Sequence, residues 1–224
     1  MVITALEPFG KTKIKVYLND QYMFWVYSSD IRTLRWKTGQ DVTSEEYEEV
    51  LQKVVLTNAK KKAVALLSKM DYASGDMKSK LRKAEYPEPV IEAVAVSLLN
   101  KGYLDDRRYA ENYVINQGQR KGKGILRLEL QKKGISGEEI EYALENMSAQ
   151  EELDNAYELL KKKYFCWRRE QLRLVGGSEE ELTDGERMDI PDYQSIQKMK
   201  AAAFRKGYSG DIIAKAWSKL QQEI

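Results

Sequence analysis

The stretch that decides the fold is Lys133-Gly134-Ile135-Ser136-Gly137, because a close copy of it, Lys206-Gly207-Tyr208-Ser209-Gly210, occurs 73 residues later. In both copies a glycine is followed by a large apolar residue and then by a serine. Glycine readily adopts the left-handed conformation that ends a helix, and serine caps the helix that follows. Each copy therefore predicts a turn between two helices, and its recurrence predicts an internal repeat.

A third copy is predicted 49 residues before the first of these turns. This shift places Tyr86 on Ile135. In the early copy Glu85 replaces the glycine and Pro87 replaces the serine, so we expect its turn to be built differently. The longer spacing to the last copy indicates an acidic insertion at about 167–190.

A spacing near 49 residues suits three helices per repeat. Stacked units of this kind bury a continuous core and leave a long surface for binding. Unrelated helical hairpins that match by chance are the alternative, but two matched turns, each preceded by lysine, favour a true repeat. We predict a mostly α-helical fold of tandem three-helix repeats in an elongated, curved array, at residues 59–101, 102–147 and 148–224.

Residues 1–42 are predicted to form a small antiparallel sheet ahead of the repeats. Alternating and aromatic-rich stretches indicate strands near residues 2–6, 13–18 and 22–27. Three strands are marginal alone, so we expect the sheet to dock on helices. The aromatic side chains of the last strand suit either base stacking or packing, and we favour packing.

Helical spacing begins at residue 43. Thr43 and Glu46 form a capping box that starts a connecting helix at 43–58. In the first repeat we expect Met70 on the apolar face of a helix and Ser74 as the cap of the next one. Pro87 and Pro89 mark the start of a third helix, which we expect to end at Gly102.

The composition excludes several classes of chemistry. The 224 residues include no His and a single Cys, Cys166, so there is no Ser-His or Cys-His triad and no intramolecular disulfide. Cys166 stands between two aromatic residues and is expected in the core. We predict no catalytic site, metal or cofactor. No apolar run suits a membrane span and no secretory signal is recognised, so we expect a cytoplasmic monomer.

Asp105 and Asp106 form a carboxylate pair that could hold Mg²⁺. A metal-dependent hydrolase or nuclease is therefore one class of function to consider. Aspartate between a turn and an amphipathic helix is more often a helix cap, and we favour that role for this pair.

The placement of charge points to nucleic acid. Lys and Arg number 37 and Asp and Glu 35, so the net charge of +2 attracts no polyanion by itself. Basic residues nevertheless cluster in the first two repeats, and solvated decoration is the alternative for each of them. In residues 120–127 the basic residues lie beside glycines, and we predict that Arg120, Lys121, Lys123 and Arg127 jointly contact phosphate. The candidates for binding nucleic acid or a filament are Lys80, Arg82, Lys83, Arg107, Arg108, Arg120, Lys121, Lys123, Arg127, Lys132 and Lys133.

Several motifs together resemble one family. They are Gly102-Tyr103-Leu104-Asp105-Asp106, Arg108-Tyr109-Ala110, Lys121-Gly122, Leu128-Glu129-Leu130 and Lys133-Gly134-Ile135. In this order and spacing they resemble the RecX family, bacterial regulators of the RecA recombinase. The resemblance covers residues 59–220, and the N-terminal sheet resembles the extension of longer family members. Glu85 and the acidic insertion depart from the pattern.

The resemblance implies tandem three-helix repeats and a non-enzymatic function in recombination, DNA repair and the SOS response. The implied partner is the RecA filament on single-stranded DNA, bound along its groove so that recombinase, coprotease and ATPase activities fall, while DNA alone is bound weakly. A helical-repeat nucleic-acid-binding or scaffold protein unrelated to RecA is the alternative. The residues that carry the structural motif are Gly102, Tyr103, Leu104, Asp105, Asp106, Tyr109, Gly134 and Gly207.

Overall fold

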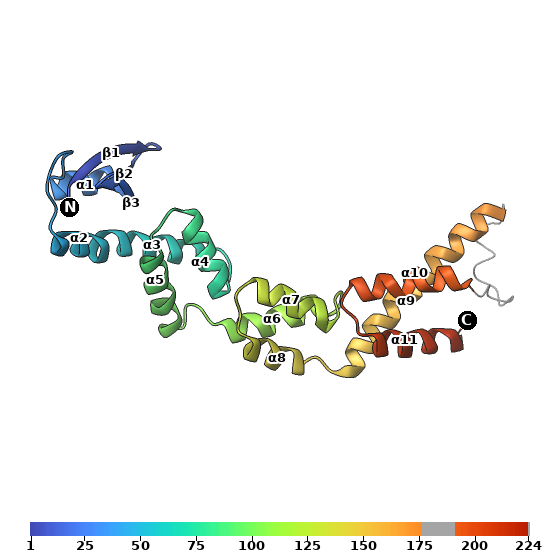
Figure 1. The fold of residues 1–224 in the computed structure, drawn as a ribbon. Coiled ribbons are helices and arrows are strands. Elements are labelled where there is room, and N and C mark those ends of the chain that lie inside the picture. The colour runs from blue at the N-terminus through green and yellow to red at the C-terminus, as the bar shows by residue number, and fades with distance from the viewer. Residues whose placement is uncertain (176–190, 224) are drawn as a thin grey trace. The chain divides into compact units, whose positions relative to one another are not determined.

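The computed structural model describes residues 1–175 and 191–223. A small sheet comes first, and helices make up most of the rest (Figure 1). The chain divides into two compact units, Met1–Asp106 and Arg107–Ile224. Each unit has a hydrophobic core of its own. Among the described residues, no helix is both long enough and apolar enough to cross a membrane.

The sheet consists of β1 (Ile3–Phe9), β2 (Lys13–Leu18) and β3 (Gln21–Tyr27), antiparallel and in that order, as predicted. The β2–β3 turn has positive φ at Asn19 and Asp20, 47° and 63°, which suits the twist of a two-residue hairpin. The sheet is followed by a short helix, α1 (Ser28–Leu34), which the sequence analysis did not predict.

Three helical segments then follow one another directly. They are α2 (Ser44–Val50), the π-helical η1 (Leu51–Val55) and α3 (Leu56–Leu67). The capping box is confirmed: Glu46 N donates to Thr43 Oγ1 at 3.1 Å, and Thr43 N donates to the Glu46 carboxylate at 2.8 Å. The expectation for Met70 is wrong, because α3 ends before it and its side chain is exposed.

The remaining helices complete three successive triplets, α3–α4–α5, α6–α7–α8 and α9–α10–α11. The predicted mostly α-helical fold of three-helix repeats after a small sheet is thus confirmed. Residues 167–175 of the expected insertion belong to α9, and residues 176–190 lie outside the described residues. The bounds are α4 (Ser74–Lys83), α5 (Glu88–Asn100), α6 (Asp106–Gly118), α7 (Lys123–Lys132), α8 (Gly137–Glu145), α9 (Ala149–Val175), α10 (Tyr193–Arg205) and α11 (Gly210–Glu223).

One turn geometry joins the second and third helices of all three triplets. Gly134 and Gly207 have φ of 80° and 89°, and Glu85 has φ of 61°. In each copy the N–H of this left-handed residue donates to the carbonyl three residues earlier at 2.9 Å. The expectation of a differently built turn is wrong for the backbone, because Glu85 takes the glycine-like conformation. The next residue is buried in every copy: Tyr86, Ile135 and Tyr208. The same expectation is confirmed for the helix cap, because Pro87 makes no side-chain cap whereas the hydroxyls of Ser136 and Ser209 accept from backbone N–H groups.

The sheet docks on the turn of the first repeat, as expected. Trp25 Nε1 donates to the Ala84 carbonyl at 2.7 Å, and the Tyr22 hydroxyl donates to the Glu85 carbonyl at 3.1 Å. Lys15 Nζ lies 2.7 Å from the Glu85 carboxylate. Because the indole of Trp25 is buried in this contact, packing rather than base stacking is its role. The sheet thus caps the first repeat, as terminal units do in repeat proteins.

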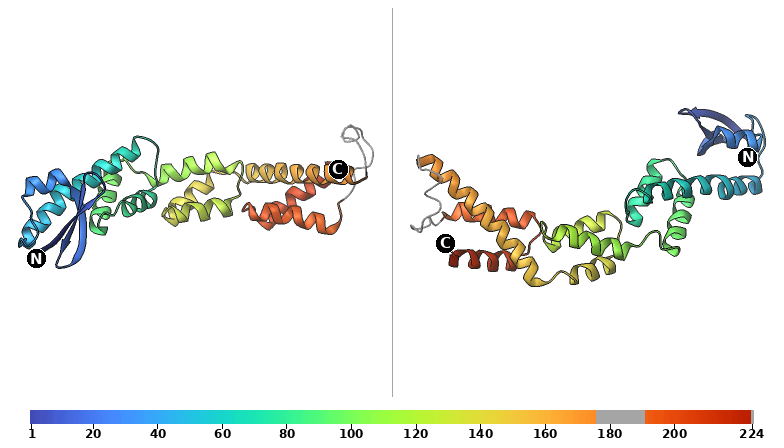
Figure 2. Two further views of the ribbon diagram at one scale, coloured as in Figure 1. Left: turned by 90° about the horizontal axis from the view of Figure 1, so that it is seen from above. Right: turned by 180° about the vertical axis from the view of Figure 1, so that it is seen from behind.

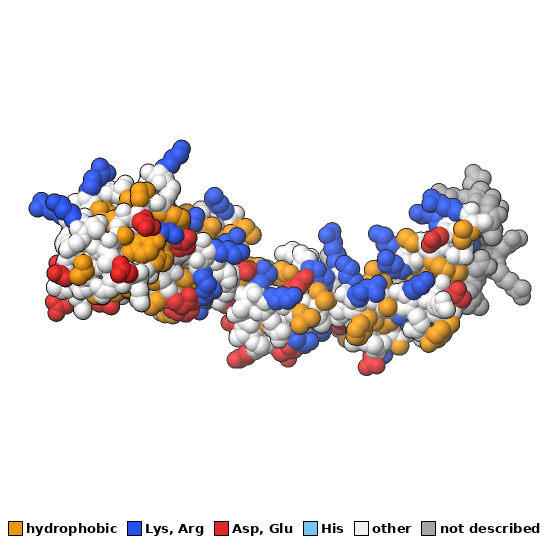
Figure 3. All heavy atoms as spheres, turned by 45° about the horizontal axis from the view of Figure 1, so that its top comes forward, with side chains coloured by type: hydrophobic (Ala, Val, Ile, Leu, Met, Phe, Trp, Pro, Cys, Tyr) orange, Lys and Arg blue, Asp and Glu red, His pale blue; other side chains and the backbone are white. Residues whose placement is uncertain are grey.

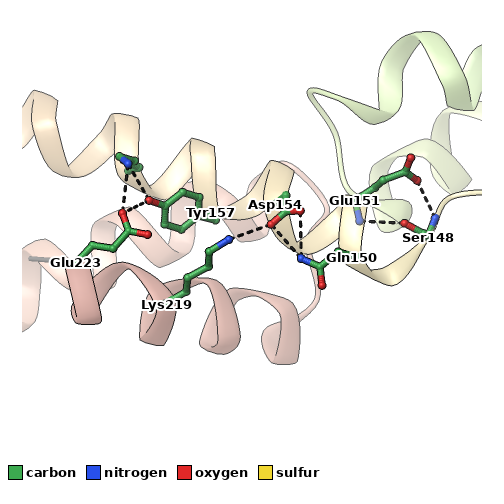
Figure 4. A network of polar contacts seen from close by, with 8 residues as sticks. Ser148, Gln150, Glu151, Asp154, Tyr157, Lys219 and Glu223 are labelled. Atoms are coloured by element: carbon green, nitrogen blue, oxygen red, sulfur yellow. Dashed lines mark hydrogen bonds and ion pairs between the residues drawn. The ribbon is translucent and has the colours of Figure 1, made fainter.

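In the second unit α9 and α11 run side by side (Figure 2). Their apolar faces form the core, and polar contacts join their edges (Figure 4). Lys219 Nζ donates to Asp154 at 3.1 Å, the Tyr157 hydroxyl donates to Glu223, and Lys161 Nζ donates to the Tyr157 oxygen at 2.8 Å. Basic side chains of the third repeat are in this way used for internal contacts.

Candidate nucleic-acid interface

The eleven basic candidates fall in both units. Lys80, Arg82 and Lys83 lie on α4 in the first unit, and the other eight lie on or beside α6 and α7 in the second unit. Because each unit holds part of the set, the candidates do not form one site within a single unit. Their local contacts and their exposure differ from one candidate to the next.

Two of the candidate arginines are paired with carboxylates. Arg82 Nε donates to Glu88 at 3.0 Å, and Arg127 donates from Nε and Nη2 to the two oxygens of Glu141 at 2.6 and 2.7 Å. The hydrogen bond from Arg127 lowers the pKa of Glu141 below its usual value. A guanidinium that grips a carboxylate with both arms has fewer donors left for a phosphate.

Lys121 and Lys133 belong to a cluster with two tyrosines. The rings of Tyr109 and Tyr113 stack 6.2 Å apart, and Lys133 Nζ lies 5.5 and 5.6 Å from their centroids. Lys121 Nζ donates to both oxygens of Glu129 at 2.8 Å, which raises the pKa of Lys121. The Tyr113 hydroxyl donates to the same carboxylate at 2.9 Å. Lys121 is thus tied into the surface of α6 and α7.

The N-terminus of α7 is not an open phosphate cradle. The backbone N–H groups of residues 122–124 all have acceptors within the second unit. The acceptors are, in order, the Lys206 carbonyl (2.8 Å), the Glu152 carboxylate (3.1 Å) and the Gly207 carbonyl (3.0 Å). Glu152 was not among the expected site residues, because it lies in the first turn of α9, 29 residues along the chain from Lys123, and no local signal links the two.

The glycines of this segment allow two backbones to touch. A Cβ on Gly122 would lie 2.5 Å from the Gly207 carbonyl, and one on Gly124 would lie 2.9 Å from its oxygen. A Cβ on Gly207 would lie 2.3 Å from Ile125 N. These distances are shorter than van der Waals contact, so three glycines hold α7 against the turn between α10 and α11.

Seven candidates present exposed side chains, which are Lys80, Arg82, Lys83, Arg107, Arg108, Arg120 and Lys132. In the second unit, Lys and Arg side chains gather along one edge in Figure 3, and most Asp and Glu side chains lie along the opposite edge. This placement suits a surface that attracts phosphate on one side. Among the exposed candidates, Arg107 also contacts a ring, because its guanidinium lies 3.5 Å from the Tyr142 ring centroid.

The motif at residues 102–106 is structural. Gly102 has φ of 70° and ends α5, as expected, and Leu104 is buried in the core of the first unit. Asp106 begins α6 and accepts a hydrogen bond from Ser74 N at 2.7 Å and another from the Ser74 hydroxyl. The expectation that Ser74 caps α4 is wrong, because Ala73 holds the cap position and Ser74 is the first helical residue.

The capping role favoured for Asp106 fits these bonds, which tie the N-termini of α4 and α6 together. Among residues 1–175 and 191–223, no group of three or more metal-ligating side chains occurs. The expectation that Cys166 lies in the core is wrong, because its side chain is exposed. It lines a hollow between α9 and α10, beside Lys163 and Lys198.

Comparison with known proteins agrees with this architecture. The family model for RecX, second three-helix domain, matches residues 105–144. A solved structure of regulatory protein RecX superposes with a TM-score of 0.63 at 22% identity, over 97% of this chain and 98% of the other. RecX from Lactobacillus salivarius superposes with a TM-score of 0.58 at 23% identity, over 75% of this chain and 97% of the other. At such identities the structures support the fold.

Relatives at the sequence level extend the similarity. Regulatory protein RecX of Clostridioides difficile is 27% identical over 224 residues, which cover 98% of this chain and 95% of that protein. Regulatory protein RecX of Clostridium acetobutylicum is 30% identical over 152 residues, which cover 67% of this chain and 71% of that protein. With this identity, the matched three-helix domain and the shared fold, the chain belongs to the RecX family of regulatory proteins.

Proposed function

We propose that this chain binds the filament of a RecA-type recombinase on single-stranded DNA and lowers its recombinase and ATPase activities. The observation that carries the proposal is membership of the RecX family. The exposed basic side chains on α4, α6 and α7 support it, because they are suited to a polyanion or to the protein that coats one. The repeats proposed at residues 59–101, 102–147 and 148–224 would each add a contact, and linked contacts raise avidity.

We propose a non-enzymatic role and weak direct binding to DNA. The bonds from Ser74 to both oxygens of Asp106 support a structural use of that carboxylate. Two further features limit the affinity for bare DNA: the net charge is only +2, and Lys121 and Arg127 are paired with carboxylates. We expect this weak binding to bare DNA to fall steeply with salt, because it rests on phosphate contacts, and the association with the filament to be tighter.

The test is a titration of the chain into RecA turning over ATP on single-stranded DNA. We expect the ATPase rate to fall as the chain is added, and strand exchange to fall with it. An unchanged rate at several-fold molar excess over RecA would contradict the proposal. Equal binding to DNA with and without recombinase would favour the alternative of a nucleic-acid-binding or scaffold protein.

Among the four residues predicted to contact phosphate, Arg120 is exposed, whereas Lys121 and Arg127 are paired with carboxylates; Lys132 is an exposed candidate outside these four. We expect Arg120→Ala with Lys132→Ala to lower the salt slope of single-strand binding by up to about 0.7 per lost contact, because both side chains are exposed. The matched control is Lys121→Ala with Arg127→Ala, which removes two internally paired cations and leaves the slope nearly unchanged. A larger effect from the control pair would reverse this assignment.

A further inference from the structure

A hollow of about 680 Å³ lies between α7 and the turn that joins α10 to α11. Leu128 and Phe204 give it an apolar wall, and the basic side chains of Lys123, Arg127 and Arg205 also line it. All of these residues belong to the second unit. The hollow therefore combines apolar surface with positive charge.

The apolar wall of the hollow is exposed to solvent. Phe204 is 67% exposed and Leu128 is 51% exposed. Single exposed apolar residues are common, but two of them on one hollow form a patch.

The equivalent positions of the other repeats show that the fold does not require this patch. Arg82 and Gln131 stand where the third repeat has Phe204, and Ser79 stands where the second has Leu128. The turn geometry is the same in all three copies, so large apolar side chains at these positions serve something other than folding.

The walls of the hollow are held in place by backbone contacts. The N–H groups of Gly122 and Gly124 donate to the carbonyls of Lys206 and Gly207. A Cβ at either glycine would lie too close to the opposite backbone segment, so the two segments are in direct contact. A preformed site loses little conformational entropy when it is filled. This rigidity suits the docking of a partner.

We propose that this hollow binds a protein segment in which one large apolar side chain is flanked by carboxylates. The apolar side chain would pack between Leu128 and Phe204, and the carboxylates would face Lys123 and Arg205. Buried aromatic contacts of this kind dominate the energy of many protein interfaces. In naming the partner the proposal rests on the proposed function: the segment belongs to the recombinase.

Protein is favoured over DNA by the charges beside the hollow. The Glu152 carboxylate lines it and accepts from Lys123 N, and Glu141 occupies the guanidinium of Arg127. With these cations partly used, fewer donors remain for the several phosphates of a nucleic-acid backbone, whereas a short segment with one or two carboxylates needs only Lys123 and Arg205.

The test measures two probes by fluorescence anisotropy: a labelled peptide with one central Phe between acidic residues, and labelled oligo(dT). The variant is Phe204→Gln, which introduces the residue type of the equivalent position 131. The control is Ile115→Ser, because Ile115 is 70% exposed on α6 and does not line the hollow. We expect Phe204→Gln to weaken peptide binding at least about tenfold, and Ile115→Ser to leave it unchanged.

Three results would overturn the proposal. They are no binding of the acidic peptide by the native chain, equal peptide binding by Phe204→Gln, and a loss that affects oligo(dT) more than the peptide. The last result would assign the hollow to DNA. A RecA ATPase titration runs alongside: if the native chain leaves the ATPase unchanged, the proposed function fails, while the peptide measurements still decide the hollow.

Discussion

Equivalent turns in the first and third repeats accept the same two hydrogen bonds from different donors. In the first repeat, aromatic side chains of β3 are the donors. Trp25 Nε1 donates to the Ala84 carbonyl, and the Tyr22 hydroxyl donates to the Glu85 carbonyl. These rings keep the two backbones apart. The turn residue can therefore carry a side chain, and Glu85 does so at φ of 61°.

In the third repeat the donors are backbone N–H groups. Gly122 and Gly124 reach the carbonyls of Lys206 and Gly207 directly, so the two main chains touch. A Cβ at any of the three glycines would lie within 3 Å of an atom of the opposite backbone segment. The type of donor therefore determines whether glycine is required, and the left-handed backbone alone does not.

The largest expected effect comes from Gly207→Ala. It combines left-handed strain with a Cβ 2.3 Å from Ile125 N, and we expect a loss of about 3 kcal/mol or more in the free energy of unfolding. Gly102→Ala is the matched control, because Gly102 has φ of 70° but open space around its Cβ, and should lose about 1 kcal/mol. Urea unfolding of both variants measures the difference, and equal losses would remove the role of the close approach.

A smaller effect is expected for Trp25→Phe in the first unit. The change removes the donor to the Ala84 carbonyl and part of a buried ring, and should lower the free energy of unfolding by about 2 kcal/mol. Tyr27→Phe, on the same strand and partly exposed, should change it by less than about 0.5 kcal/mol. Thermal unfolding compares the two, and a similar loss in both would mean that the hydrogen bond contributes little.

The third effect concerns the turn residue itself. Glu85→Gly and Glu85→Ala both remove the contact with Lys15, but only glycine relieves the left-handed strain. We therefore expect the Gly variant to be more stable than the Ala variant by about 1 kcal/mol. If urea unfolding gave the two variants the same stability, the backbone at residue 85 would not be strained.

The smallest effect extends the comparison to ion pairs. Burial by itself would raise the pKa of Glu129, but hydrogen bonds from Lys121 and Tyr113 outweigh it and hold that pKa below its usual 4.5. A lowered carboxyl pKa gives stability that is present above pH 4.5 and is lost as the pH falls through the folded-state pKa. At pH 6 the free energy of unfolding of the native chain should be higher than that of Glu129→Gln by less than about 1 kcal/mol.

Unfolding temperatures measured from pH 6 down to 3 test this expectation, since the difference between the two proteins should shrink as the solution becomes acidic. Glu88→Gln provides the control in the first unit, because the Arg82–Glu88 pair is more exposed than the Lys121–Glu129 pair. A pH-dependent difference at least as large for Glu88→Gln would mean that partial burial of the pair does not matter.

Much of the fold was predictable because its signals are local. Alternation predicted the three strands, the Thr43–Glu46 box predicted the start of α2, and the glycines at 134 and 207 predicted two of the turns. Such signals depend on neighbours in the chain and need no tertiary contact. The errors occurred where a distant group decides the outcome, as with Ser74, whose partner is Asp106.

The candidate site was predictable only in composition. The sequence places basic residues on α4, α6 and α7, but a cation's availability depends on which carboxylate lies across the fold. Arg127 on α7 pairs with Glu141 on α8, and Lys121, which precedes α7, pairs with Glu129 on α7. These ion pairs depend on how the helices and the residues before them pack, so the sequence pattern did not predict them.

By itself, the sequence determined the repeat, its turns, the absence of histidine chemistry and the family, since each of these is a matter of residue type and spacing. Only the tertiary structure decided that the glycines at 122 and 124 serve backbone contact and that Phe204 stands exposed beside a basic hollow. The physical reason is distance: hydrogen bonding, burial and ion pairing act over a few ångströms between residues that lie far apart in the chain.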